Sequence, residues 1–203
     1  MKPRKHLDLG CGTKPKNPYN FELLYGVDFE KININKIKEA KVIEIKCANL
    51  CLDKIPYNSD YFDSVSAYDF LEHIPRIITK LNKNKLTTHY AFIDCMNEIY
   101  RVLKHKGRFY AVTPIYPDAS AFVDPTHVNI MSHKTFHYFC LPSLGAKMYG
   151  FKGKFEVIRV KKIRPKYVYE PQILSFKQKL RKLNDKIKNL ESHLLWEFEA
   201  IKK

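Results

Sequence analysis

The segment His6-Leu7-Asp8-Leu9-Gly10-Cys11-Gly12 decides how the rest of the chain is interpreted. We expect an apolar strand over Lys5–Leu9 that leads through Asp8 into a turn with two glycines one residue apart. In parallel sheets, such a turn lets bare backbone come close to a ligand. The glycine fingerprint of dinucleotide-binding folds would need a third glycine at position 15, which is proline here. The segment therefore predicts a ligand-binding turn that lacks the third glycine of the dinucleotide-binding pattern.

Strands and helices alternate through the first 115 residues. This alternation favours a parallel sheet covered on both faces, since parallel strands need crossover connections. Pro15 and Pro18 leave room for only a short first helix. The expected strands after the first are 25–28, 42–45, 62–67 and 108–114, and the expected helices are 19–24, 32–41 and 91–104.

A second carboxylate, Asp28, ends the next expected strand, twenty residues after Asp8. At about this spacing, an acidic side chain at the tip of strand two can accept hydrogen bonds from a ribose diol. Asn49 follows the third strand, where a side-chain amide could read an adenine edge. The alternative for both carboxylates is that they cap a turn and a strand end. Their occurrence together at this interval favours a nucleoside ligand.

Several segments carry a family resemblance by their order and spacing. They are Leu7–Gly12, Gly26–Asp28, Leu52–Asp63, Phe70–Ile74 and Glu98–Arg108. Over residues 5–115 this succession resembles the class I S-adenosylmethionine-dependent methyltransferases, in particular their small type 11 branch. The resemblance implies a Rossmann-like, mostly parallel seven-stranded sheet with helices on both faces and S-adenosylmethionine across its C-terminal edge.

The same resemblance implies roles for single residues. Asp8, Gly10 and Gly12 would line the methionine end of the cofactor. Asp28 would hold the ribose hydroxyls, and Asn49, where the family usually has aspartate, would stand near the adenine. S-adenosylmethionine has no phosphate, so carboxylates beside a close backbone turn suit it better than a phosphate cradle. The expected cofactor pocket is completed by Cys11, Leu50 and Tyr68.

Two histidines are the candidates for chemistry at the methyl acceptor. Methyl transfer needs an acceptor atom held in line, and it needs a base only when that atom must lose a proton. His73 follows the fourth strand and His127 lies in the loop after the fifth, so both would sit at the C-terminal edge of the sheet. The alternative for His127 is a hydrogen bond that fixes its loop.

Asp69, Glu72 and His73 match an acidic-x-x-Glu-His pattern that binds a divalent cation in some quinone O-methyltransferases of this family. Two carboxylates and one imidazole on a single turn could hold Mg²⁺, with water completing its shell. Glu72 and His73 can instead cap and hydrogen-bond the start of the next helix. We favour capping, so no metal site is predicted, and these three residues are the candidates if there is one.

The chain is strongly basic, with a formal net charge of +15, of which +9 falls in residues 151–203. Such charge attracts nucleic acid, anionic lipid or acidic glycan, although a solvated lysine-rich surface explains it equally well. The five cysteines form no CxxC pair, which indicates reduced thiols. No apolar run is long enough for a membrane span and no signal peptide is visible, so we expect a cytoplasmic protein.

Apolar residues recur at steps of three and four from Ile173 to Ile201, with Glu197 the one break. This pattern is typical of the seam of a coiled coil. We therefore expect a methyltransferase domain over 1–165 and a C-terminal amphipathic helix over 170–203. The helix could pair with another subunit, pack on its own domain or lie along an anionic surface. A homo-oligomer is the preferred prediction, because so narrow a seam suits one facing helix.

The sequence thus predicts a methyltransferase that acts on a hydroxyl or carboxyl group of a small molecule or glycan. Residues 76–90 and 115–132 would build the acceptor pocket. RNA methylation is an alternative that rests on the charge, and no dedicated nucleic-acid module supports it. A non-catalytic cofactor-binding or assembly subunit is the third interpretation.

Overall fold

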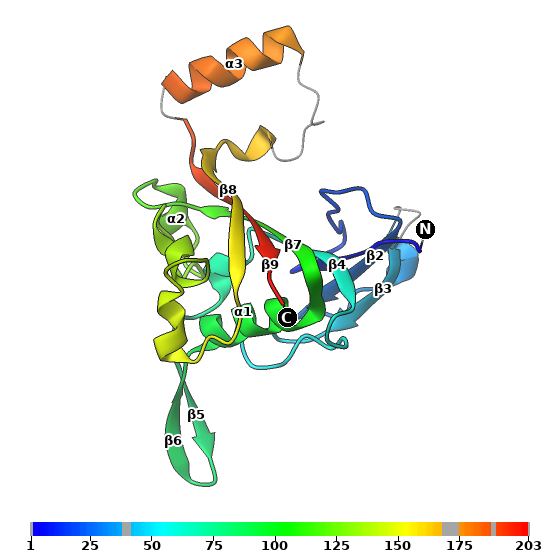
Figure 1. Ribbon diagram of the computed structural model, residues 1–203, viewed down its shortest axis with the longest axis vertical. Helices are drawn as coiled ribbons and strands as arrows, with labels where there is room; N and C mark the ends of the chain where they lie inside the picture. Colours follow the sequence, from blue (N-terminus) through cyan, green and yellow to red (C-terminus); the bar gives the residue numbers. More distant parts are fainter. Residues whose placement is uncertain (1, 38–41, 168–174, 188–189, 203) are drawn as a thin grey trace.

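The chain folds around a seven-stranded sheet, seen in a computed structural model (Figure 1). The structure describes residues 2–37, 42–167, 175–187 and 190–202. The strands of the sheet are β1 (Lys5–Leu9), β2 (Leu23–Asp28), β3 (Val42–Cys47), β4 (Phe62–Tyr68), β7 (Leu103–Pro114), β8 (Phe155–Ile163) and β9 (His193–Ala200). Their order is β3-β2-β1-β4-β7-β9-β8, in which β9 runs antiparallel to both neighbours and the first five strands are parallel. The predicted Rossmann-like, mostly parallel sheet is confirmed.

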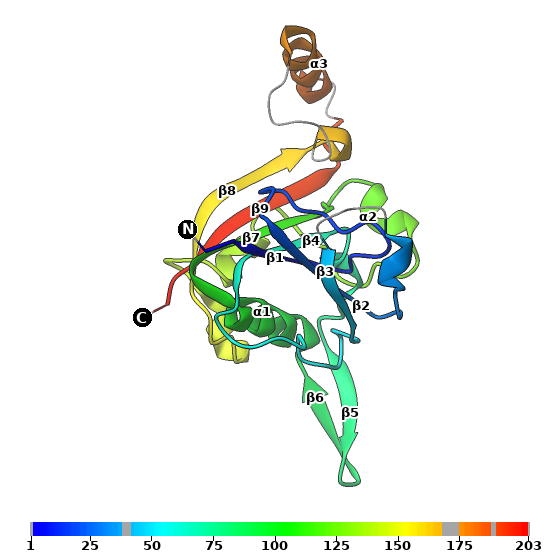
Figure 2. The ribbon, with the colours of Figure 1, turned by 90° about the vertical axis from the view of Figure 1, so that its right-hand side faces the viewer.

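The remaining elements are short and lie around the sheet (Figure 2). A two-stranded hairpin, β5 (Ile78–Asn82) and β6 (Lys85–His89), projects from the domain. No helix in the described part of the chain is both long and apolar enough to cross a bilayer. The helices are α1 (Ala91–Val102), α2 (Ser120–Val123) and α3 (Phe176–Ile187), with 3₁₀ turns η1 (Ile34–Lys36), η2 (Leu71–His73), η3 (Thr135–Tyr138), η4 (Gly145–Tyr149) and η5 (Pro165–Tyr167).

Helix α1 covers one face of the sheet, as its sequence pattern predicts (Figure 2). Met96, Ile99 and Val102 lie at steps of three and have no exposed surface. They share the main core with Leu7 and Leu9 of β1. Each such side chain stabilises the fold by about 1.5–3 kcal/mol relative to an exposed one. The apolar face of α1 therefore shares one core with β1 and with Val65 and Ala67 of β4.

A loop without a regular helix covers the opposite face beside β1. Residues 19–24, predicted as a short helix, form turns and the start of β2. The prolines at 15 and 18 deny the segment helical backbone hydrogen bonds, and the Asn17 side chain brackets a turn by bonding both N and O of Phe21. Within the predicted helix 32–41, the structure has only the 3₁₀ turn η1 among the described residues, and 38–41 lie outside them.

The predicted coiled-coil helix over 170–203 is wrong in its last part. Residues 193–200 form β9, which lies inside the sheet between β7 and β8 (Figure 1). Leu194, Trp196, Phe198 and Ala200 are fully buried, with the alternation of a strand. The helix is limited to α3, and residues 170–174 and 188–189 lie outside the described part. The expected homo-oligomer, which rested on this seam, stays an untested prediction.

Candidate functional site

The glycine turn lies at the carboxyl end of β1, and its backbone requires glycine. Gly10 and Gly12 have φ of +63° and +49°, the left-handed region that L-residues avoid. The Gly10 N–H donates to the Val27 carbonyl of β2 at 2.9 Å. A Cβ on Gly10 would stand 2.6 Å from Cδ2 of Phe70, whereas one on Gly12 would meet nothing within 4 Å. The turn is thus closed at Gly10 and open at Gly12.

Asp28 lies against this turn, as the sequence predicts. It ends β2 and is 8% exposed. Its Oδ2 accepts the Gly12 N–H at 2.8 Å, and its Oδ1 accepts the Glu30 N–H at 3.1 Å. The carboxylate and the glycine turn therefore form one unit at the edge of the sheet.

Asp8 is held in a buried polar network. Its Oδ1 accepts the Ser66 hydroxyl at 2.5 Å, and its Oδ2 accepts the Lys16 N–H of the covering loop at 2.7 Å. His6, also buried, contacts Ser64 and Ser66 at 2.6 and 2.8 Å. Burial lowers the pKa of His6 to about 3, so the ring is neutral at physiological pH. The network joins β1, β4 and the loop behind the glycine turn.

The other predicted pocket residues differ in exposure. Cys11 is buried against Gly26, and burial, with Asp8 and Asp28 nearby, raises the pKa of its thiol to about 12, so the thiol is protonated at neutral pH. Asn49 is exposed, and its side-chain oxygen accepts the Cys51 N–H at 3.1 Å and closes a turn. Leu50 is buried in the turn that follows β3. Tyr68, the last residue of β4, lies beside Tyr110 of β7 with ring centroids 5.6 Å apart and ring planes tilted by 40°.

Phe29 is a residue that the sequence reasoning missed. It directly follows Asp28 and is 72% exposed, a high value for a phenylalanine. Its carbonyl accepts the Cys47 thiol at 3.2 Å, so it lies between the ends of β2 and β3. An exposed ring beside a carboxylate that the sequence predicts to bind a diol is suited to stacking on a base. The signal was an aromatic residue directly after the strand-end carboxylate.

His73 and His127 come together at the same edge, with ring centroids 4.9 Å apart. The Thr126 hydroxyl donates to Asp124 at 2.7 Å and also contacts His73 Nδ1 at 2.9 Å. Because the single hydroxyl hydrogen goes to Asp124, His73 Nδ1 is assigned as the donor and Nε2 as the acceptor. His127 Nδ1 faces the Ala121 carbonyl at 3.3 Å, which assigns the same tautomer. Both Nε2 atoms therefore carry a lone pair.

Glu72 is the buried acid beside these histidines. One carboxylate oxygen accepts the Thr113 hydroxyl at 2.9 Å, and the other has no hydrogen-bond partner among the described residues. Burial raises its pKa to about 7, and the charges of Asp69 and Asp124 add to the rise. The sequence predicted Glu72 as a cap or a metal ligand, and the structure gives it a pKa suited to proton exchange near neutral pH.

The predicted metal candidates do not assemble as a set. Among the described residues, the group whose ligand atoms lie within 4.8 Å of one another is Glu72, His73 and His127. Asp69 has positive φ, and its carboxylate lies 3.4 Å from His193 Nε2 of β9. Two imidazoles and one carboxylate are a poor donor set for Mg²⁺, which prefers oxygen ligands. The less favoured alternative of a Mg²⁺ site is therefore not supported.

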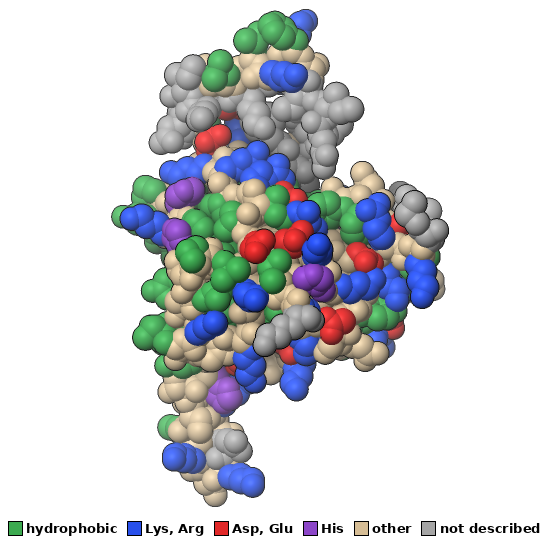
Figure 3. Space-filling view, in the orientation of Figure 1, with side chains coloured by type: hydrophobic (Ala, Val, Ile, Leu, Met, Phe, Trp, Pro, Cys, Tyr) green, Lys and Arg blue, Asp and Glu red, His purple; other side chains and the backbone are tan. Residues whose placement is uncertain are grey.

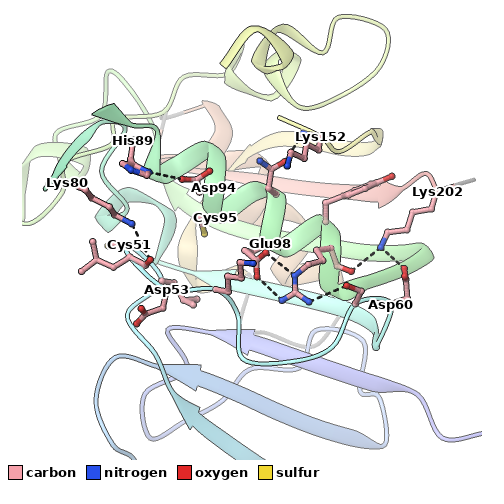
Figure 4. Close-up of a pocket in the computed structure, with 17 residues that line it drawn as sticks. Cys51, Asp53, Asp60, Lys80, His89, Asp94, Cys95, Glu98, Lys152 and Lys202 are labelled. Carbon is pink, nitrogen blue, oxygen red and sulfur yellow. Dashed lines mark hydrogen bonds and ion pairs between the residues drawn. The ribbon is translucent and has the colours of Figure 1, made fainter. Parts of the chain in front are cut away.

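Residues 76–90, expected to build the acceptor pocket, form the β5–β6 hairpin. The hairpin also borders a hollow of about 850 Å³ beside α1 (Figure 4). Charged groups in this hollow bond to other groups of the protein: Lys80 donates to the Leu52 carbonyl at 3.3 Å, His89 lies 4.0 Å from Asp94, and Lys202 lies 2.5 Å from Asp60. Leu50, a predicted cofactor-pocket residue, lines its edge, but none of the histidines or glycines described above does. The hollow is a separate feature from the candidate site.

Comparisons with known proteins agree with this geometry. A family model described as Methyltransferase domain matches residues 7–111. A Methanocaldococcus jannaschii protein, MJ0638, is 30% identical over 107 residues, which are 52% of this chain and 39% of that protein. The chain thus spans about two fifths of the length of that relative.

Two solved structures show the same fold. A chain of the complex that contains the Trm112 methyltransferase activator of Haloferax volcanii has a TM-score of 0.61 at 13% identity, over 100% of this chain and 84% of that one. Phosphoethanolamine N-methyltransferase 1 of Haemonchus contortus, in complex with phosphoethanolamine and S-adenosylhomocysteine, has a TM-score of 0.58 at 11% identity, over 100% of this chain and 40% of that one. By its domain match, its strand order and its glycine turn, the chain belongs to the class I S-adenosylmethionine-dependent methyltransferase family.

Proposed function

We propose that the protein methylates a hydroxyl or carboxyl group of a small molecule or glycan, with S-adenosylmethionine as the methyl donor. One observation carries the proposal: the Asp28–Gly12 unit and the Glu72–His73–His127 group lie at the C-terminal edge of the same parallel sheet. In open α/β sheets this edge is where ligands bind. This arrangement supports a cofactor end at the Asp28–Gly12 unit and an acceptor end at the Glu72–His73–His127 group.

The residues present fit the cofactor. Asp28 already accepts a backbone N–H at 2.8 Å and offers carboxylate oxygens to a diol, and Gly12 leaves open space above its Cα. Phe29 offers an exposed ring for a base. Asp8 would act from behind the turn, since it is only 2% exposed and its carboxylate is bonded to Ser66 and to the Lys16 N–H of the covering loop. When bound, the cofactor supplies an electrophilic methyl group.

At the acceptor end, His73 is the residue placed to take a proton. Its Nδ1 is bonded to the Thr126–Asp124 pair, which leaves Nε2 as the basic atom and stabilises the charge that the ring gains. Glu72, with its pKa raised to about 7, is a second proton acceptor within the same cluster. An acceptor hydroxyl needs such a base, whereas an acceptor carboxylate needs only positioning.

Cofactor binding is tested by titration calorimetry with S-adenosylhomocysteine. Asp28→Asn removes the charge from the diol-binding carboxylate and should weaken binding at least about tenfold, as expected for a lost charged hydrogen bond. Asp94→Asn, on the exposed surface of α1, is the matched control and should bind as the wild type does. If the wild type binds no cofactor, the non-catalytic interpretation gains and the proposal fails.

Acceptor chemistry is tested by release of S-adenosylhomocysteine from S-adenosylmethionine in the presence of hydroxylated, carboxylated and RNA acceptors. His73→Gln should lower kcat for a hydroxyl acceptor about 100-fold or more while cofactor affinity stays unchanged. Turnover with RNA alone would replace the small-molecule or glycan proposal with the RNA alternative. Equal kcat for His73→Gln and wild type would remove His73 from the role of base.

A further inference from the structure

The β5–β6 hairpin is a projecting arm that the candidate active site does not use (Figures 1 and 2). Its strands pair from Ile78 and His89 to Asn82 and Lys85. The two turn residues, Lys83 and Asn84, have φ of 44° and 63°, as a tight two-residue hairpin turn requires. The arm is thus a complete hairpin with a defined register and a defined tip.

The hairpin has an apolar pair near its tip. Leu81 and Leu86 are direct cross-strand partners, and they are 70% and 69% exposed. Side chains alternate between the faces of a hairpin, so the pair lies on the face opposite Lys80. Lys80 donates a hydrogen bond to the Leu52 carbonyl of the domain. The hairpin face that carries Lys80 is therefore directed toward the domain, and the face that carries the leucines is directed outward. Covering two neighbouring leucines on an outward face with an apolar surface is favourable, because it removes their side chains from water.

The same arm is basic throughout. Residues 76–90 contain Arg76, Lys80, Lys83 and Lys85 and no Asp or Glu, which gives a formal charge of +4. Lys or Arg side chains are visible at the tip of the hairpin (Figure 3). Lys83 in the turn and Lys85, which by the same alternation lies on the opposite face beside Asn82, are both exposed within a few residues of the leucine pair. The tip therefore combines an exposed aliphatic pair with two exposed lysines.

We propose that the hairpin tip docks on an anionic lipid bilayer. Leu81 and Leu86 would enter the boundary between headgroups and acyl chains, and Lys83 and Lys85 would contact lipid phosphates. Burial of apolar area and attraction to anionic lipids are the two contributions that hold peripheral elements on membranes. The proposal does not depend on the reaction that the site performs.

Other occupants fit these side chains less well. Single-stranded nucleic acid favours aromatic side chains that stack on bases, and the two strands and their turn, residues 78–89, contain no Phe, Tyr or Trp. Tyr90, at the root of the arm, lies against Tyr149 of the domain, with ring centroids 5.3 Å apart. A second copy would bring two arms of charge +4 together, which repel each other. The root of the arm is also fixed, since Arg76 donates to Asn129 Oδ1 at 2.8 Å and to the Ile130 carbonyl. A rigidly rooted arm loses little conformational entropy on docking.

The test is sedimentation of the full chain with sucrose-loaded vesicles of phosphatidylcholine containing about 30% phosphatidylglycerol. The wild type should sediment with these vesicles and at least about tenfold less with pure phosphatidylcholine. Leu81→Ser/Leu86→Ser should lower the partition coefficient at least about tenfold, because two buried aliphatic groups are lost. Lys83→Glu/Lys85→Glu should lower it about as much, because two attractive charges become repulsive.

Helix α3 provides matched controls, because it also carries exposed leucines and lysines. Leu180→Ser/Leu183→Ser and Lys177→Glu/Lys179→Glu make the same chemical changes away from the hairpin, and both should bind as the wild type does. Leu86→Trp places a fluorescent side chain at the hairpin tip and so reports insertion directly. The native Trp196 is fully buried, so its emission should not change when vesicles are added. The new tryptophan should show a blue shift with anionic vesicles.

Three outcomes would overturn the proposal. One is equal vesicle binding by the leucine variant and the wild type. Another is loss of RNA binding by Lys83→Glu/Lys85→Glu with no vesicle binding by the wild type, which would assign the arm to nucleic acid. The third is a dimer, found by sedimentation velocity, that Leu81→Ser/Leu86→Ser converts to a monomer while the wild type ignores vesicles.

Discussion

At the scale of single residues, the ionisation of Glu72 opposes folding. Its pKa is raised from 4.5 to about 7 in the folded protein, mainly by burial. At a pH below the pKa of the unfolded chain, Glu72 is protonated in both the folded and the unfolded protein, and its burial does not lower the free energy of unfolding. As the pH rises toward and through the pKa of the folded protein, the buried carboxyl loses its proton and becomes a buried charge. The free energy of unfolding is then lower than it was with the carboxyl protonated. The full difference is on the order of 3 kcal/mol.

Replacing Glu72 by glutamine should therefore stabilise the protein in a pH-dependent way. The amide oxygen can still accept the Thr113 hydroxyl, but it has no charge to desolvate. We expect a free energy of unfolding about 2 kcal/mol higher than that of the wild type at pH 8, and a difference close to zero at pH 4.5. Urea unfolding at the two pH values measures both. An advantage of equal size at the two pH values would contradict the argument, and Asp94→Asn should show none.

The two glycines of the turn should differ when each is replaced by alanine. Both have positive φ, so each substitution costs about 1 kcal/mol from the backbone. At Gly10 the new Cβ would also stand 2.6 Å from Phe70, whereas at Gly12 it meets nothing within 4 Å. We expect Gly10→Ala to lose about 1–3 kcal/mol more stability than Gly12→Ala in urea unfolding. Equal losses would mean that the Phe70 ring moves aside at no cost.

Some contacts of the candidate site followed from sequence and others did not. The spacing from Asp8 to Asp28 placed two carboxylates at neighbouring strand ends, and the second indeed bonds the glycine turn. The positions of His73 and His127 after adjacent strands placed both at one edge. The partner of Asp69 could not be foreseen, because His193 reaches it from a strand far along the chain. Contacts across such a separation depend on topology and leave no local pattern.

At the scale of elements, β9 shows how a strand can imitate a helical seam. Leu190, Leu194 and Ile201 continue the three-and-four spacing of the preceding segment, and this spacing suggested one long helix. The stronger signal was the alternation of Leu194, Trp196 and Phe198 with Glu197 and Glu199. Glu197 pairs with Arg159 at 2.7 Å and Glu199 with Arg108 at 3.2 Å, on the face opposite the core. The break at Glu197 was therefore a strand position with its own partner.

This topology predicts that the segment between β8 and β9 is dispensable while β9 is not. Ile163 and His193 are cross-strand partners, so a short Gly-rich loop can replace residues 165–191 without changing the register. The melting temperature of that variant should stay within about 4 °C of the wild type, a change of about 1 kcal/mol or less. A chain truncated after residue 191 should not fold, because it lacks the buried Trp196 and Phe198. A cooperative melt of the truncated chain would contradict the sheet topology.

At the scale of the whole molecule, the charge of +15 provides a test of the RNA alternative. Positive charge that is spread over a surface attracts any single-stranded RNA, whatever its sequence. The affinity of such binding falls as the salt concentration rises, and it falls more steeply the more phosphates are contacted. For about four contacts, affinity should fall about fiftyfold between 50 and 200 mM salt. An enzyme with a built RNA site would instead keep a preference for one sequence or structure at the higher salt.

The loop-replacement variant sharpens this test because it removes charge without touching the sheet. Residues 165–191 contain seven Lys or Arg and three Asp or Glu, so the variant has a net charge of +11. If the binding is purely electrostatic, the variant should bind poly(U) more weakly at 50 mM salt and show a shallower dependence on salt than the wild type, while its affinity for S-adenosylhomocysteine stays the same. Fluorescence anisotropy with poly(U) and with a structured RNA measures both slopes. If one of the two RNAs stays bound at 200 mM salt while the other dissociates, the basic surface recognises a defined RNA, and the acceptor proposed above would have to be replaced.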